Sequence, residues 1–251
     1  MALDLLELHE QALARTRRDV AGIGADQWDA STPCDGWTVR DVANHIVNGN
    51  FWAAELARGK TIADVGDRLD GDVLGADPLA AYDESARAAD AAFRAPGAME
   101  APCAVSYGPV PGEVYAGHRF IDLLIHGWDL AKAIHRGWPI TGQQVSLIWS
   151  GVEPILPGWV QPARSAGHQA AYQVHLGDTR PHVLCFTTGK LTTALPPGRR
   201  IDCHIGGSPE AILLILYRRL SPWRAALTGR VVAWGPRPWL AFSLTDRFYL
   251  P

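Results

Sequence analysis

The stretch Asp122-Leu123-Leu124-Ile125-His126-Gly127-Trp128-Asp129 lies within a run from 114 to 134 that predicts one long helix. Asp122 and His126 are four residues apart, so their side chains lie one turn apart on the same helical face. A carboxylate and an imidazole placed in this way can bind the same cation. A catalytic zinc ion usually takes three protein ligands and keeps one position open, so a third ligand is expected from elsewhere in the chain.

The predicted third ligand is His45, which lies in an earlier helical stretch. Thr38 is a good N-cap and Asp41 completes a capping box, so the start of this helix fixes where His45 points. We therefore expect His45, Asp122 and His126 to be both the metal ligands and the catalytic residues, between two packed helices. The ligand types suit a catalytic zinc, but a non-haem iron site uses the same types, so another divalent metal stays open. A local ion pair and a core histidine are the ordinary alternatives.

Composition limits the classes of protein to which the chain can belong. It has 251 residues, of which 47% are hydrophobic, enough for one large or two ordinary domains. Its 23 basic and 26 acidic residues argue against a nucleic-acid partner. No apolar run is long enough for a membrane span, and the acidic N-terminal stretch does not have the pattern of a signal peptide. Four cysteines without Cys-x-x-Cys spacing favour reduced thiols and a cytoplasmic location. We expect a monomer or a homodimer.

Hydrophobic periodicity predicts two domains joined by a linker. Residues 1–138 are expected to form a bundle of four main helices, a usual place for a metal site. Residues 139–164 are expected to be a linker with a possible helix, and 165–251 a small α+β domain. The expected elements, in chain order, are helices at 3–23, 38–56, 78–95 and 114–134, an extended segment at 103–107, strands at 171–176, 182–186, 190–194 and 201–205, a helix at 209–220, a strand at 227–234 and a final helix or strand after 238.

Three further residues are candidates for binding a cofactor or substrate. Asn48 follows His45 on the predicted helix and has an amide that could hydrogen-bond a ligand. Arg218 and Arg237 could bind an anionic group, because a guanidinium pairs with carboxylates through two hydrogen bonds. The ordinary alternative for both arginines is a solvated surface position.

Other polar residues near the candidate ligands have weaker signals. Cys34 lies close to the start of the His45 helix, where a thiolate is favoured, although a loop cysteine is the simpler interpretation. His118 lies one turn before Asp122 and could be a fourth ligand or support a ligand. The simpler expectation is that it does neither. Asp129 is expected to cap or pair elsewhere.

Two motifs, 32–45 (Thr-Pro-Cys-Asp-Gly-Trp-Thr-Val-Arg-Asp-Val-Ala-Asn-His) and 122–130, together resemble the DinB-like metal-binding superfamily. They are most similar to its mycothiol-dependent maleylpyruvate isomerase branch. The resemblance implies an N-terminal DinB-like four-helix bundle that binds a divalent metal, usually zinc, through His45, Asp122 and His126. Isomerases of this branch commonly have Glu where this chain has Asp122. Because Asp is shorter than Glu, helix spacing or coordination mode is expected to differ from that of those isomerases. The stretch 205–214 is similar to the α+β sterol-carrier-like domain that follows the bundle in this branch.

The resemblance also implies a reaction. Zinc lowers the pKa of a coordinated thiol, and in this branch the thiol is the small molecule mycothiol, acting as co-substrate. The thiolate can add to an electrophilic double bond, permit rotation and leave, or it can be transferred onto an electrophilic small molecule. We therefore expect a mycothiol-dependent isomerase or S-transferase. Two alternatives stay open: a non-catalytic carrier of an apolar ligand, and a metal-dependent detoxification protein that uses another thiol.

Overall fold

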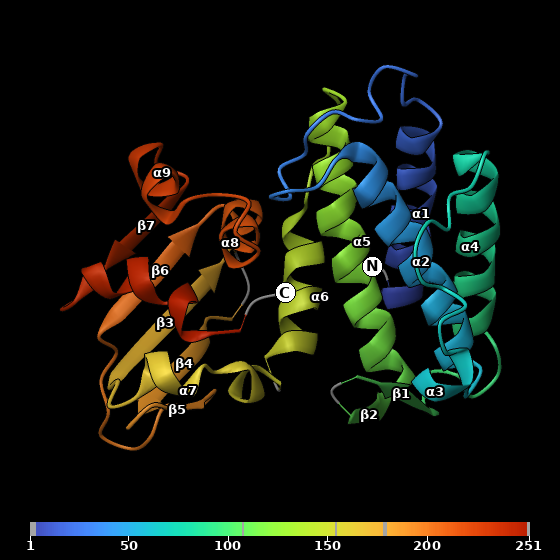
Figure 1. The fold of residues 1–251 in the computed structure, drawn as a ribbon. Helices are drawn as coiled ribbons and strands as arrows, with labels where there is room; N and C mark the ends of the chain where they lie inside the picture. The colour runs from blue at the N-terminus through green and yellow to red at the C-terminus, as the bar shows by residue number, and fades with distance from the viewer. Residues whose placement is uncertain (1–3, 107, 154, 178–179, 250–251) are drawn as a thin grey trace. The chain divides into compact units, whose positions relative to one another are not determined.

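A computed structural model describes residues 4–106, 108–153, 155–177 and 180–249 (Figure 1). The chain divides into two compact units, Met1–Trp138 and Pro139–Pro251. The first is built mainly of helices, and the second contains a five-stranded sheet with helices. The predicted fold class, a helical bundle followed by an α+β domain, is confirmed. None of the helices in the described part of the chain is both long and apolar enough to cross a bilayer.

Four long helices form the first unit. Helix α2 packs against α4 and α5, and α1 packs against α5 and α4. A short helix and a hairpin complete the unit. The elements in chain order are α1 (Leu5–Val20), α2 (Val39–Ala57), α3 (Ile62–Val65), α4 (Pro78–Phe93), β1 (Pro102–Val105), β2 (Gly108–Pro111) and α5 (Gly112–Ala133). The extended segment expected at 103–107 is the first strand of this hairpin, and Tyr107 lies outside the described residues.

Side-chain caps fix where the site-bearing helix begins. The Thr38 hydroxyl accepts a hydrogen bond from Asp41 N at 3.2 Å, and the Asp41 carboxylate accepts one from Thr38 N at 2.9 Å. The predicted capping box is therefore confirmed. Such a cap contributes about 1 kcal/mol to stability by satisfying backbone N–H groups that have no partner within the helix. Helix α2 then continues without a break through Gly49 to Ala57.

The core of the first unit combines apolar side chains with a buried histidine. Phe93, Phe120 and Leu124 are almost completely buried. His9 is also buried, at 1% exposure, and its ring meets Phe93 edge to face at a centroid distance of 5.7 Å. Burial, and then the positive charge of Arg119, lower the pKa of His9 from 6.5 to about 4. His9 is therefore neutral in the folded protein at neutral pH.

The buried histidine predicts a loss of stability in acid. Because the pKa of His9 is about 4 in the folded state and 6.5 when unfolded, the unfolded chain binds more protons between these values. The stability present above pH 6.5 should fall as the pH is lowered towards 4, by on the order of 3 kcal/mol from this residue. Urea unfolding at pH 7 and pH 4.5 measures the change, and His9→Phe should reduce it. An equal change in wild type and variant would contradict the assignment.

The second unit has a mixed sheet in the order β5-β4-β3-β6-β7, in which β3 and β6 are parallel and the other pairs antiparallel. Segment 139–164 was expected to be a linker with a possible helix. It belongs to this unit and contains two short helices and most of a third. The elements are α6 (Gly142–Val152), η1 (Leu156–Trp159), α7 (Pro162–Ser165), β3 (Ala170–Leu176), β4 (His182–Thr187), β5 (Lys190–Thr192), β6 (Cys203–Gly207), α8 (Pro209–Leu216), α9 (Pro222–Leu227), β7 (Val231–Trp234), η2 (Pro238–Ser243) and η3 (Thr245–Arg247).

One predicted strand is wrong over its first half. The sequence from 227 to 234 was expected to be extended, but Leu227 ends helix α9 and the strand begins only at Val231. The start signal for this helix is Ser221-Pro222, a pair typical of a helix N-terminus. Gly229 has a φ of +68°, a conformation that separates the helix from the strand. The tail after 238, expected to be a helix or strand, forms the 3₁₀ helices η2 and η3.

Candidate metal centre

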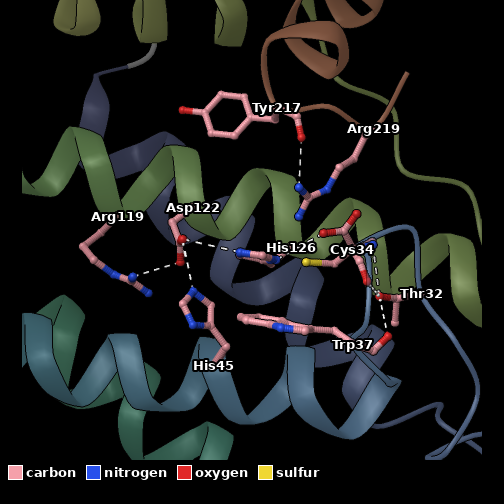
Figure 2. Close-up of polar contacts among 10 residues, drawn as sticks. Thr32, Cys34, Trp37, His45, Arg119, Asp122, His126, Tyr217 and Arg219 are labelled. Atoms are coloured by element: carbon pink, nitrogen blue, oxygen red, sulfur yellow. Dashed lines mark hydrogen bonds and ion pairs between the residues drawn. The ribbon is translucent and has the colours of Figure 1, made fainter. Parts of the chain in front are cut away.

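The three predicted metal ligands lie together between helices α2 and α5 (Figure 2). Asp122 Oδ1 lies 3.3 Å from His45 Nε2 and 3.6 Å from His126 Nε2. The two imidazole centroids are 4.6 Å apart, and one ligand atom from each of the three residues lies within 4.8 Å of the others. The fold thus brings a carboxylate and two imidazoles to one point from segments far apart in the sequence.

The spacing of these atoms fits a small divalent cation. Zinc bonds to imidazole nitrogen and carboxylate oxygen are near 2.0–2.1 Å, which places two tetrahedral ligand atoms about 3.4 Å apart. The distances of 3.3 and 3.6 Å from Asp122 to the two histidines are close to that value. The donor set also suits iron and other divalent metals. The residues therefore fit a metal, and their role as ligands stays a prediction.

Arg119 holds the second oxygen of the Asp122 carboxylate. Its Nη1 donates a hydrogen bond to Asp122 Oδ2 at 2.9 Å, while Oδ1 faces the histidines. Arg119 is 8% exposed and packs over Gly49 of α2. A Cβ at position 49 would lie 2.3 Å from Arg119 Nη2, so a larger residue there would displace the guanidinium from this position. This close approach explains a glycine in the middle of a helix.

Asp122 is held in its charged form. Burial of the carboxyl group acts to raise its pKa, but the neighbouring Arg119 guanidinium and contacts with His45 and His126 outweigh burial and hold the pKa well below its usual range. The carboxylate therefore carries a negative charge, which a cation would require of this position.

Asp129 fixes the orientation of the His126 ring. The Asp129 carboxylate is completely buried, and its Oδ2 lies 3.1 Å from His126 Nδ1. A proton on Nδ1 donated to this carboxylate leaves the Nε2 lone pair facing Asp122 and His45, which is the tautomer a metal needs. The expectation that Asp129 would pair elsewhere is wrong. The i, i+3 spacing from His126 was the sequence signal for this contact.

The loop before α2 forms a wall of the site (Figure 2). Thr32 Oγ1 accepts a hydrogen bond from Cys34 N at 3.1 Å and donates one to the Trp37 carbonyl at 2.9 Å, which holds the loop in a turn. The Trp37 ring stacks on His126 at a centroid distance of 5.5 Å and an angle of 14°. Cys34, His126 and Asp129 form a second group of potential ligands, with one atom from each within 4.8 Å.

The other predicted binding residues lie in different settings. The Asn48 amide, on α2, donates to the Leu69 carbonyl. Arg237 belongs to the second unit, where its Nη2 lies 3.0 Å from Asp202 Oδ1. Arg218 also belongs to the second unit and follows α8 with a φ of +59°. Their roles in binding a cofactor stay predictions. His118 is in neither of the two ligand groups found among the described residues.

The contact between Asp129 and His126 should set the strength of metal binding. Asp129→Asn keeps the size of the side chain but removes the charge that favours the required tautomer. Zinc affinity should fall about 10- to 100-fold, as it does for other residues that orient metal-bound histidines. Competition with a chromophoric chelator measures the affinity. Asp67→Asn, at an exposed position, is the matched control, and equal affinities in both variants would contradict the role.

Comparison with known sequences found one matching family model and related proteins. Residues 9–131 match the family model described as the mycothiol maleylpyruvate isomerase N-terminal domain. The chain is 36% identical over 149 residues to the uncharacterized proteins MT0763 and Rv0738 of Mycobacterium tuberculosis, an alignment that covers 58% of this chain and 71% of each relative.

Among solved structures, the chain is similar to the mycothiol-dependent maleylpyruvate isomerase and to a variant of that enzyme with a histidine-to-alanine substitution. Both have a TM-score of 0.60, with 16% and 15% identity, over 92% of this chain and 93% of the other. At such identities this similarity shows a shared fold.

Proposed function

Because the chain belongs to the mycothiol maleylpyruvate isomerase N-terminal domain family, we propose that it is an enzyme that reacts a metal-activated thiol with an electrophilic small molecule. The thiol is mycothiol, and the reaction is either isomerisation or S-transfer. The observation that carries the proposal is the set of three ligand atoms within 4.8 Å, from His45, Asp122 and His126.

Each residue of the site has a distinct task in this proposal. His45, Asp122 and His126 hold zinc or another divalent metal. Zinc bound there would lower the pKa of a coordinated thiol, so that the thiol reacts as a thiolate. Arg119 keeps Asp122 charged and turned towards the histidines, and Asp129 holds His126 in the tautomer with a free Nε2.

The surroundings of the ligands favour reaction with a co-substrate from solution. The His45 side chain is 37% exposed, so small molecules can reach the site. The centroid of the Trp37 ring lies 5.0 Å from that of His45 and 5.5 Å from that of His126, so the indole forms an apolar wall of the site. An apolar wall strengthens charge interactions beside it, because it displaces water. An electrophile with an apolar part could pack against this indole.

A cytoplasmic location is part of the proposal. Cys103, Cys185 and Cys203 are not joined in disulfide bonds within the described part of the chain. Free cysteines are usual where the compartment is reducing, which is also where a small-molecule thiol is kept available as a co-substrate.

Loss of one ligand should remove both metal and turnover. Wild-type protein purified without added metal is expected to carry about one zinc per chain, and His126→Ala none, because two remaining ligands do not make a stable site. Elemental analysis measures the metal, and conversion of maleylpyruvate in the presence of mycothiol, either to its isomer or to a thiol adduct, measures the activity. His135→Ala, an exposed histidine just after α5, is the matched control and should keep both. Turnover at the wild-type rate in metal-free protein would overturn the mechanism.

The choice of thiol and the kind of reaction can be read from the products. Mycothiol should support turnover, whereas glutathione and cysteine at the same concentration should give at least tenfold lower rates. Mass spectrometry then separates the two reactions, since isomerisation leaves the substrate mass unchanged, whereas S-transfer gives a product that contains the thiol, heavier by the mass of the thiol less that of any group displaced. Equal rates with all three thiols would favour the alternative of a detoxification protein that uses another thiol.

A further inference from the structure

Two histidines on neighbouring strands of the second unit have ring nitrogens close enough to interact. His175 Nε2 lies 3.3 Å from His204 Nδ1, although the two residues are 29 positions apart in the sequence. His175 belongs to β3 and His204 to β6, the parallel pair of strands in the sheet. Imidazole nitrogens at this distance either share one proton in a hydrogen bond or bind one cation together. Neither histidine belongs to the metal centre proposed in the first unit.

The sheet holds both histidines on one face. Val174 and Ile205, their neighbours along the chain, line a cavity of about 100 Å³ beside the sheet. Successive side chains of a strand point to opposite faces, so His175 and His204 lie on the face away from that cavity. Adjacent strands are hydrogen-bonded to each other, and side chains on such elements are positioned more precisely than side chains on loops. The short distance between the two rings is therefore a property of the sheet.

Trp234, on β7, restricts the orientation of both rings. Its ring stacks on His204 at a centroid distance of 5.2 Å and an angle of 9°, and it lies 5.0 Å from the His175 ring. Gly206 is opposite His175 in the strand register, and a Cβ there would lie 3.1 Å from the Trp234 ring, so the glycine leaves space for the indole. Both histidines are only half-buried, so part of each stays exposed to solvent. Side chains restricted in this way lose less freedom when they bind a ligand.

We propose that His175 and His204 together bind one divalent transition-metal cation, such as zinc, through His175 Nε2 and His204 Nδ1. Imidazole is a common ligand of these cations, and metal–nitrogen bonds near 2.0–2.1 Å place two tetrahedral ligand atoms about 3.4 Å apart, close to the 3.3 Å found here. Burial, and then the charge of His204, lower the pKa of His175, which favours the neutral ring that a metal needs. Water would complete the coordination, since the pair is in neither of the groups of three ligands found among the described residues.

Counting bound zinc in variants of the full-length protein tests the site. After equilibrium dialysis over a series of free zinc concentrations, wild type should hold about two ions per chain, His204→Gln and His126→Ala about one each, and the double variant none. His204→Gln leaves a single imidazole, so zinc affinity at this site should fall about 100-fold through loss of the second point of attachment. His135→Gln, which removes an exposed histidine of the first unit, is the matched control and should keep both ions.

These counts separate the histidine pair from the metal centre of the first unit. If that centre binds no metal, wild type should still hold one ion, which His204→Gln loses. Equal zinc binding by wild type and His204→Gln across the series would show a hydrogen-bonded pair only and would overturn the proposal. His175→Gln should cause the same loss, and it decides the question if circular dichroism shows that His204→Gln does not fold. Nitrogen NMR of zinc-bound wild type should show coordination at His175 Nε2 and His204 Nδ1, and the absence of zinc from both nitrogens would also overturn the proposal.

Discussion

The carboxylate of Asp122 contacts both a buried arginine and the two histidines of the candidate metal centre. One oxygen accepts a hydrogen bond from Arg119, and the other lies between His45 and His126. The guanidinium lies over Gly49 on the facing helix, so the packing of α2 against α5 affects the group that pairs with Asp122. A larger side chain at position 49 would therefore disturb the hydrogen bond from Arg119 to Asp122 Oδ2.

The sequence predicted the parts of the site that depend on local geometry. Helical spacing placed Asp122 and His126 on one face, and the capping box at Thr38 fixed the helix that carries His45. The support of Asp129 for His126 was missed, although its spacing is also local, because that spacing does not show which nitrogen of the ring faces which partner. The contact of Arg119 with Gly49 could not be predicted, since it depends on how closely two distant helices approach.

In the second unit, too, the features that depend on local sequence were predicted and those that depend on distant contacts were not. Strands β3 and β6 lie where apolar and polar residues alternate along the sequence, which is a local signal. Helix α9 was missed because it has only six residues, and its last residue, Leu227, was assigned to the strand that follows Thr228-Gly229-Arg230. The cavity beside the sheet depends on side chains from many elements that meet only in the folded chain. No single stretch of the sequence contains a signal for it.

Helix α5 contributes more side chains to the candidate metal centre than helix α2 does. Arg119, Asp122, His126 and Asp129 all come from α5, whereas His45 comes from α2, 77 positions from Asp122. A cation held by this set would act as a cross-link across a long loop of chain, present in the folded state and lost on unfolding. The concentration of free metal would then set how firmly α2 is held to α5. A shortage of metal would loosen the bundle as well as empty its site.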